Sequence, residues 1–195
     1  MPRIDFFVRF GVFAVKNFVD RSECAELIEE MRRSRVIPAT LSDASVNRDQ
    51  RRANEAVTMK DSHVRLERKL LDLRPELENH FKDKFSECEG PQFLIYSPGD
   101  FHCPHVDRPS DSSYPEYAKN RKITLSINLN SDSDPADHYE GGLLTLYGLP
   151  GKAWQSCGFP LEPETGLLVA FPADLMHEVS PVLHGERFSV VSWFS

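Results

Sequence analysis

The segment FHCPHVDRPSD, residues 101–111, places a histidine and a carboxylate two positions apart between two prolines. If this segment is a strand, His105 and Asp107 share one face, because alternate strand residues point the same way. An imidazole and a carboxylate that point into one cavity can both bind a metal ion. Such a pair is frequent by chance, so a metal site here requires a third ligand from elsewhere in the chain.

The third ligand is His177, in the segment FPADLMHEVSPV, where it follows a proline-containing turn and opens a predicted strand. Two imidazoles and one carboxylate form the facial triad of non-haem Fe(II) oxygenases. Three protein ligands occupy one face of an octahedron and leave three positions open. A keto acid can chelate two of them and O₂ can take the last. The three residues therefore predict an iron site for oxygen chemistry.

Arg187 follows ten residues after His177, in the segment HGERFSVVSWF. A dicarboxylate bound in a cavity has a far carboxylate that must be paired if it is buried. Arginine supplies a planar, two-pronged donor for that group. Strand alternation puts Arg187, Ser189, Val191 and Trp193 on one face, so we expect the guanidinium and the indole to face the same cavity.

The carboxyl-terminal half must supply the scaffold, since from residue 92 it changes to short β segments separated by glycine and proline. Strands of this number and spacing are typical of a sandwich or a barrel. We predict strands at residues 92–96, 105–107, 122–129, 141–147, 166–171, 177–182 and 187–194.

One of these strands predicts what lies on either side of it. In residues 123–130 apolar and polar side chains alternate, so one face can receive helices and the other can line a wet cavity. The apolar positions are Ile123, Leu125, Ile127 and Leu129, and the polar positions are Thr124, Ser126, Asn128 and Asn130.

The amino-terminal half predicts helices that cover this apolar face. A buried strand at residues 10–18 precedes a helix with a capping box that starts at Asp20. Residues 35–60 are polar and irregular, which indicates a long loop with a short strand. A second helix starts after Asp61, and Pro75 is expected to break or restart it. Its predicted apolar positions are Val64, Leu66, Leu70, Leu71, Leu73, Leu77 and Phe81.

Composition excludes several classes of protein. The 195 residues fit a single domain, residues 1–195. The net charge of −7 disfavours a nucleic-acid binder, and we expect the basic stretch 47–54 to be a solvated loop. No run of 18 apolar residues and no clean signal peptide are present, so we expect no membrane association. None of the four cysteines forms a C-x-x-C pair, which favours a reducing, cytoplasmic location.

With these motifs in place, the carboxyl-terminal half resembles the 2-oxoglutarate- and Fe(II)-dependent dioxygenases, most closely their prolyl 4-hydroxylase branch. The matching segments are YSPGDFHCPHVDRP, RKITLSINLN, EGGLLTLYG, TGLLVAFPADLMHEVSPV and GERFSVVSWF, in the family's order. The resemblance implies a mainly β, α+β fold: a double-stranded β-helix, or jelly roll, with amino-terminal helices packed on one sheet. Residues 91–195 would form the dioxygenase core and residues 1–90 a supporting strand and helix region.

The resemblance also implies roles for individual residues. It makes His105, Asp107 and His177 the iron ligands and Arg187 the partner of the far carboxylate of 2-oxoglutarate. Tyr96 matches a tyrosine that contacts 2-oxoglutarate, Trp193 a tryptophan near iron and substrate, and Arg121 an arginine near the substrate entrance. Two positions depart from the pattern: Asn128 stands where close relatives have a second cosubstrate-binding tyrosine, and His102 where they often have an aromatic residue.

The implied activity is hydroxylation of a substrate carbon, with a prolyl residue of a peptide or protein as the leading substrate. The cofactors would be Fe(II), 2-oxoglutarate and O₂, with ascorbate as an optional reductant. We expect loop 35–60 and segment 130–140 to border the substrate entrance.

Three alternatives stay open. The substrate could be a free amino acid or small metabolite. The nucleic-acid demethylating branch is disfavoured because its second arginine is replaced here by Trp193. The barrel could also be a non-catalytic binding or sensing module.

Overall fold

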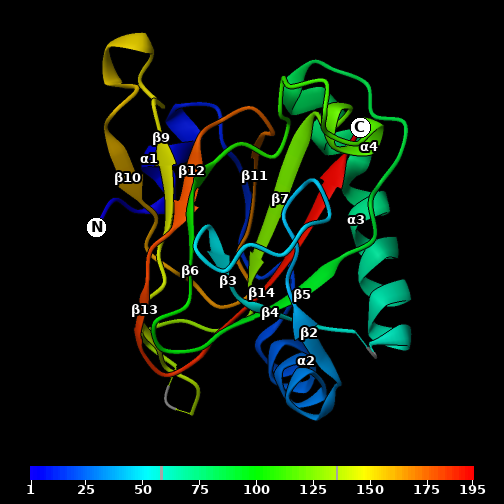
Figure 1. The fold of residues 1–195 in the computed structure, drawn as a ribbon, viewed down its shortest axis with the longest axis vertical. Coiled ribbons are helices and arrows are strands. Elements are labelled where there is room, and N and C mark those ends of the chain that lie inside the picture. Colours follow the sequence, from blue (N-terminus) through cyan, green and yellow to red (C-terminus); the bar gives the residue numbers. More distant parts are fainter. Residues whose placement is uncertain (58, 135) are drawn as a thin grey trace.

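The computed structural model describes residues 1–57, 59–134 and 136–195. Two antiparallel sheets face each other, as Figure 1 shows, and all pairings between the described strands are antiparallel. This is the predicted jelly roll, a mainly β fold in which helices are the minority.

The larger sheet has seven strands, in the order β1 (Phe13–Val15), β11 (Leu168–Pro172), β7 (Ile123–Asn128), β14 (Arg187–Phe194), β5 (Gln92–Tyr96), β4 (Asn54–Ala56) and β2 (Val36–Pro38). The smaller sheet has five, in the order β10 (Gly158–Pro160), β9 (Leu144–Tyr147), β12 (His177–Val179), β6 (Phe101–His105) and β3 (Arg51–Arg52). A separate ribbon pairs β13 (Val182–His184) with β8 (Glu140–Gly141).

The amino-terminal residues contribute strands as well as helices. Residues 35–60, predicted as a loop with one short strand, contain three short strands that divide between the two sheets: β2 and β4 extend the larger sheet, and β3 edges the smaller one. The strand predicted at residues 10–18 is shorter than expected, because β1 spans only Phe13–Val15. Helix α1 (Ile4–Arg9), which was not predicted, precedes it, and its Phe7 belongs to an apolar cluster with residues of β9 and β11.

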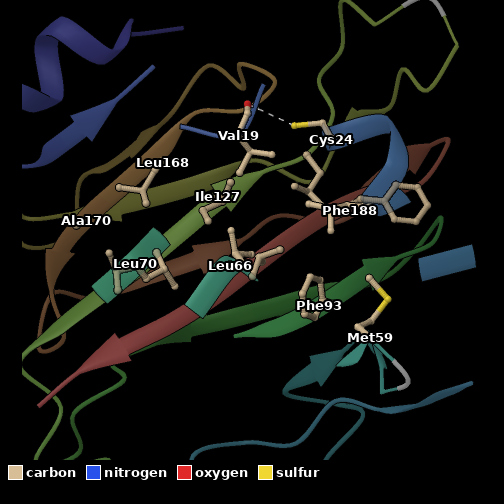
Figure 2. Packing of buried hydrophobic residues seen from close by; sticks show 14 of the residues in the cluster. Val19, Cys24, Met59, Leu66, Leu70, Phe93, Ile127, Leu168, Ala170 and Phe188 are labelled. Atoms are coloured by element: carbon tan, nitrogen blue, oxygen red, sulfur yellow. Dashed lines mark hydrogen bonds between the residues drawn. The ribbon is translucent and has the colours of Figure 1, made fainter. Parts of the chain in front are cut away.

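Two long helices cover the outer face of the larger sheet. Helices α2 (Arg21–Arg33) and α3 (Lys60–Phe81) bury Leu27, Met31, Leu66 and Leu70 against strand residues in one apolar core. Figure 2 shows Leu66 and Leu70 of α3 in this core, beside Ile127 and Phe93 of the sheet. The predicted cap of α2 is confirmed, because the Asp20 side chain accepts a hydrogen bond from the Glu23 amide at 2.9 Å. Two short helical segments, α4 (Glu116–Lys119) and a 3₁₀ turn at Lys152–Trp154, complete the fold.

The prediction that Pro75 breaks the second helix is wrong. Helix α3 runs continuously from Lys60 to Phe81 with Pro75 inside it. Proline removes the hydrogen bond to the carbonyl four residues earlier, which belongs to Leu71. Leu71 is 40% exposed, so water can bind that carbonyl on the solvent side of the helix. Leu71 and Val64 were among the predicted apolar positions of this helix, but both are exposed and neither belongs to the core.

Strand β7 confirms the predicted division of faces. Its apolar side chains, with Leu129 just beyond the strand, belong to the core under the helices. On the opposite face, Thr124 and Ser126 line a cavity between the sheets. All six residues of β7 are buried, so the polar side chains are enclosed on the inner side of the sheet rather than exposed to bulk solvent.

Within the described ranges, no helix is both long and apolar enough to cross a bilayer.

Candidate active site

A cavity lies between the two sheets. Both sheets contribute to its wall, and polar and charged side chains are concentrated there. The lining residues are Arg51, Leu94, Tyr96, His102, His105, Asp107, Thr124, Ser126, Leu144, Phe171, His177, Val179, Arg187, Val191 and Trp193.

The three predicted metal ligands meet at this cavity. His105 is the last residue of β6 and His177 the first of β12, and the two are direct partners across the antiparallel pair, with ring centroids 4.2 Å apart. Asp107 lies between them: its Oδ1 is 3.6 Å from His105 Nε2 and its Oδ2 is 3.4 Å from His177 Nε2.

From the sequence, strand alternation was expected to bring Asp107 to the same site as His105, and this expectation is wrong in part. A strand at residues 105–107 would put His105 and Asp107 on one strand face, but β6 ends at His105. Asp107 lies in a bend beyond it, where the Ala173 carbonyl accepts hydrogen bonds from the amides of Asp107 and Arg108, each at 2.9 Å. The carboxylate is therefore positioned by this turn rather than by strand alternation.

Each histidine presents its Nε2 atom to the shared site. His105 Nδ1 lies 2.8 Å from the Cys103 carbonyl oxygen, and His177 Nδ1 lies 2.9 Å from the Leu175 carbonyl oxygen. Because a carbonyl can only accept, Nδ1 is the protonated nitrogen and the Nε2 lone pair remains available to a metal. Hydrogen bonds of this kind fix the ring orientation of metal-binding histidines.

Asp107 is held from a third direction. It is 5% exposed, and Thr124 Oγ1 of β7 donates a hydrogen bond to its Oδ2 at 2.7 Å. Burial alone would raise the pKa of Asp107, but His177 and His105 outweigh burial and hold that pKa well below its ordinary value. Asp107 is therefore a carboxylate at neutral pH, as a metal ligand must be.

The two imidazoles have opposite pKa shifts. Burial, followed by the charge of His177, lowers the pKa of His105. Burial also opposes protonation of His177, but the adjacent Asp107 carboxylate outweighs it and raises the pKa of His177. Without a metal, the Asp107 carboxylate therefore favours protonation of His177, in the place where a cation would bind.

The donor set fits a divalent iron ion. One ligand atom from each of His105, Asp107 and His177 lies within 4.8 Å of the other two. Adjacent ligands of a six-coordinate ion with bonds of about 2.1 Å lie about 3 Å apart, so small side-chain shifts bring all three onto one ion. Two imidazoles and a carboxylate on one side leave the opposite side, which faces the cavity, for other ligands.

Arg187 lies in the same cavity, at the start of β14. It is 2% exposed, and its Nη1 donates to Ser189 Oγ at 2.8 Å and its Nη2 to Asn128 Oδ1 at 3.3 Å. Its Nε has no hydrogen-bond partner, and no carboxylate of the described chain lies within 4.0 Å of the guanidinium. A buried guanidinium without an anion is costly unless a ligand supplies one.

Comparison with known proteins identifies the family. Residues 91–195 match the model of the 2OG-Fe(II) oxygenase superfamily. This chain is a 2OG-Fe(II) oxygenase. The family uses Fe(II), 2-oxoglutarate and O₂, for which the His105, Asp107 and His177 triad provides the metal ligands. Among curated proteins, no sequence matches the chain.

Solved structures agree on the fold of this oxygenase. A prolyl-4-hydroxylase from Pseudomonas putida superposes with a TM-score of 0.69 at 23% identity, covering 98% of this chain and 95% of its own. A prolyl hydroxylase from Trichoplax adhaerens, in complex with a hypoxia inducible factor peptide, gives 0.72 at 18% identity over 98% and 86%. A viral collagen prolyl hydroxylase from Paramecium Bursaria Chlorella virus-1 gives 0.65 at 21% identity over 94% of each chain.

Tyr96 and Asn128, expected to contact 2-oxoglutarate, both lie beside Arg187 in the oxygenase cavity. Tyr96 is the direct partner of Arg187 across β5 and β14, and the guanidinium carbon lies 5.2 Å from the centre of its ring. Asn128 directs its carbonyl oxygen at Arg187. The asparagine therefore holds the guanidinium in place from β7.

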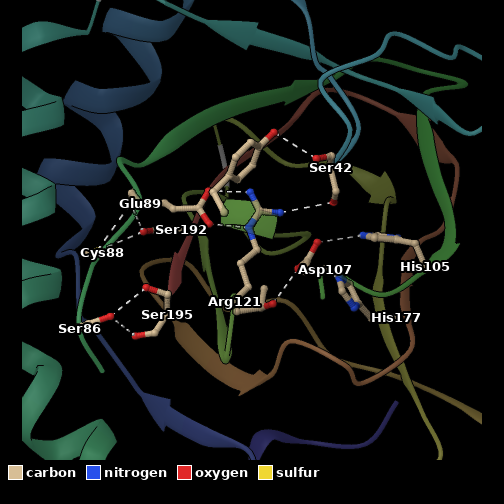
Figure 3. A network of polar contacts seen from close by, with 12 residues as sticks. Ser42, Ser86, Cys88, Glu89, His105, Asp107, Arg121, His177, Ser192 and Ser195 are labelled. Carbon is tan, nitrogen blue, oxygen red and sulfur yellow. Dashed lines mark hydrogen bonds and ion pairs between the residues drawn. The ribbon is translucent and has the colours of Figure 1, made fainter. Parts of the chain in front are cut away.

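Trp193 and Arg121 form a second layer at the other end of β14. Trp193 lines the cavity, and its indole Nε1 is buried without a partner among the described residues. Arg121 lies over the indole ring at 3.7 Å and does not line the cavity. Its guanidinium is held by Glu89 in two hydrogen bonds of 2.6 Å, and its Nη1 reaches Ser42 Oγ at 3.4 Å (Figure 3).

The two segments predicted to border the substrate entrance of the oxygenase differ in their surroundings, and the entrance itself stays a prediction. In loop 35–60, Leu41, Ser42 and Gln50 line a groove that also reaches His102 and His105. The described residues of segment 130–140 line neither this groove nor the cavity. Asp134 and Asp137 instead pair with arginines of α2 at 2.8 and 2.5 Å, and these ion pairs fix the segment beside the helix.

The remaining histidines fall into two groups. His102 stacks on His105 with ring centroids 3.5 Å apart and lies between the cavity and the groove. His138 and His184 are exposed and stack on each other at 5.5 Å.

Two cavity residues were not assigned roles from the sequence. Thr124 was placed on the cavity face, but its bond to Asp107 depends on a contact across 17 positions of the chain. Arg51 belongs to the basic stretch expected to be a solvated loop, yet it is only 6% exposed and lines the cavity. The signal for Arg51 was the density of arginine between residues 48 and 52.

Proposed function

We propose that this oxygenase hydroxylates a prolyl residue of a peptide or protein. The observation that carries the proposal is the meeting, in one cavity, of a facial triad and a buried guanidinium that has no carboxylate partner. The first fits Fe(II) and the second fits the far carboxylate of 2-oxoglutarate.

The roles of the residues follow from their positions. His105, Asp107 and His177 would hold Fe(II), with Thr124 orienting the carboxylate. Arg187 would pair the far carboxylate of 2-oxoglutarate through its free Nε. When bound, iron and 2-oxoglutarate supply the oxidation, in which O₂ converts the keto acid to succinate and CO₂ and places one oxygen atom in a substrate C–H bond.

The chain positions the cosubstrate and excludes water. Tyr96 beneath the guanidinium and Asn128 beside it restrict Arg187 to one orientation. Apolar side chains, including Leu94, Leu144 and Phe171, fill the rest of the wall and lower the local dielectric. The unpartnered Trp193 Nε1 is a buried donor for a bound ligand. A carboxylate at position 107 favours hydroxylation over halogenation, since Asp107 would serve as the third protein ligand of the metal, where a halide would otherwise need room.

Two observations support a prolyl substrate in a chain. The similar solved structures are prolyl hydroxylases, one of them in complex with a peptide. The groove beside His105, lined by Leu41, Pro104 and Tyr114, continues outside the cavity and can hold residues on either side of a target proline. A free amino acid or small metabolite is the alternative, and it would need the cavity alone.

Iron-dependent succinate release, assayed against peptides derived from a whole proteome, tests the proposal. We expect prolyl peptides to raise succinate release and to gain one oxygen atom on the proline by mass spectrometry. His177→Ala should abolish both signals. Stimulation by free amino acids or metabolites but by no peptide would refute the peptide substrate. Full activity of His177→Ala would refute the enzyme assignment.

A further inference from the structure

A second buried arginine, Arg51, lines the cavity from the sheet opposite Arg187. It lies in β3, at the edge of the smaller sheet, and is the direct partner of His102 in β6. His102 stacks on the iron-ligand candidate His105. His102 therefore lies between the strand that carries Arg51 and the iron-ligand candidate His105.

The hydrogen bonds of Arg51 leave part of its guanidinium free. Its Nη1 donates to the Thr40 carbonyl oxygen, and its Nε is buried without a partner among the described residues. No carboxylate in the described part of the chain lies within 4.0 Å of it. Glu55, four positions further on, interacts with it at longer range: burial raises the pKa of Glu55, and the charge of Arg51 opposes that rise.

The neighbouring arginines show the same excess of positive charge. Arg48 and Arg52 also form no ion pair in the described chain: Arg48 donates to the Ala53 carbonyl, and Arg52 lies over the Phe101 ring at 5.3 Å. The chain as a whole carries seven more acidic than basic groups, so three arginines without carboxylates in one short segment depart from its average.

We propose that Arg51 forms an anion subsite that binds a carboxylate of the substrate. This inference rests on the proposed function, because it assumes that a substrate enters from the groove beside His102 and His105. The carboxylate has two chemical sources. It is the side chain of an aspartate or glutamate next to the target proline, or the α-carboxylate of a carboxyl-terminal or free amino acid.

Binding without turnover provides the test. The protein is loaded with Mn(II) and 2-oxoglutarate, and fluorescent peptides are titrated by anisotropy. The first pair of probes has an internal proline followed by Glu or by Gln, and the second has a carboxyl-terminal proline as the free acid or the amide. Free proline serves as an unlabelled competitor. The variants are Arg51→Met, Arg51→Lys and the matched control Arg52→Met, whose exposed side chain lies next to Arg51 in the same strand.

We expect one acid probe to bind roughly 10-fold more tightly than its amide partner, which is the size of one charge-assisted hydrogen bond. Arg51→Met should remove that preference, Arg51→Lys should keep much of it, and Arg52→Met should keep all of it. A preference confined to the Glu peptide identifies a side-chain carboxylate as the source. A preference confined to the free acid, or displacement by free proline, identifies the α-carboxylate.

Three results would overturn the inference. The first is that no acid probe binds more tightly than its amide partner, and the second is that Arg51→Met weakens binding of acid and amide probes equally. The third is that Arg52→Met removes the acid preference as fully as Arg51→Met does. A loss of 2-oxoglutarate binding alone in Arg51→Met would also overturn it, since Arg51 would then serve the cosubstrate. If Arg51→Met does not fold, by its thermal transition, the wild-type probe pairs and Arg51→Lys still decide. Acid-selective binding without hydroxylation of any proline would refute the proposed function and leave the subsite intact.

Discussion

Two buried arginines lie at opposite ends of strand β14, and they differ in whether a carboxylate of the chain neutralises them. At the carboxyl end, Arg121 lies over Trp193 and is neutralised by Glu89. At the amino end, Arg187 lies over Tyr96, has the neutral partners Ser189 and Asn128, and has no carboxylate of the described chain within 4.0 Å. Both are nearly inaccessible, at 4% and 2% exposure. A buried charge that the chain neutralises is structural, and one that it leaves unpaired indicates a ligand.

The largest effect is expected from Arg187→Met. Because the far carboxylate of 2-oxoglutarate would lose its buried partner, KM for 2-oxoglutarate should rise by about 100-fold or more. The free energy of unfolding of the ligand-free protein should stay the same or increase, since an unpaired buried charge is removed. Succinate release and urea denaturation measure the two quantities. A marked loss of unfolding free energy with an unchanged KM for 2-oxoglutarate would contradict this prediction, because Arg187 would then be the structural arginine.

Asn128→Asp should make the Arg187 end resemble the Arg121 end. A carboxylate at this position would lie close to Arg187 Nη2, which now donates to Asn128 at 3.3 Å. It would neutralise the guanidinium internally and compete with the cosubstrate, so KM for 2-oxoglutarate should rise about 10-fold. Asn128→Ala is the control, and it should have the smaller effect because it adds no charge. An equal rise of KM for 2-oxoglutarate in Asn128→Asp and Asn128→Ala would show that the added negative charge does not cause the rise.

Arg121→Met should act on stability more than on cosubstrate binding. It leaves Glu89 without its partner and removes the cation that covers Trp193. We expect a loss of about 2 kcal/mol of unfolding free energy in urea, because Glu89 is partly exposed and water can hydrate it. KM for 2-oxoglutarate should change less than about threefold. A rise as large as that in Arg187→Met would place Arg121 in the cosubstrate site.

The smallest effect is expected from Ser42→Ala. The bond from Arg121 Nη1 to Ser42 Oγ is long, 3.4 Å, and Glu89 already satisfies the other two nitrogens of the guanidinium. The free energy of unfolding should fall by less than about 0.5 kcal/mol. A larger loss, measured by urea denaturation, would mean that loop 35–60 depends on this contact.

The sequence was most informative where the types and spacing of residues along the chain carry the signal. His105, Asp107, His177 and Arg187 could be selected from their types and order, and the structure brings all four to one cavity. The alternation in residues 123–130 predicted both faces of β7 for the same reason. The alternation is local to one segment, whereas the four site residues come from separate segments whose meeting was predicted from the family resemblance.

Features that depend on tertiary contacts were predicted poorly. Pro75 remains helical because α3 lies on the sheet with its proline turned to solvent. Segment 130–140 follows α2 because of ion pairs with residues about a hundred positions away. Arg51 is buried through pairing of a two-residue strand with β6, which no local pattern encodes.

The most direct test of the central claim is calorimetric titration of 2-oxoglutarate into Mn(II)-loaded protein without O₂. The triad and Arg187 should bind one equivalent in the wild type. His177→Ala should lose binding together with the metal, and Arg187→Met should lose it while keeping the metal. Undiminished binding of 2-oxoglutarate in either variant would contradict the claim.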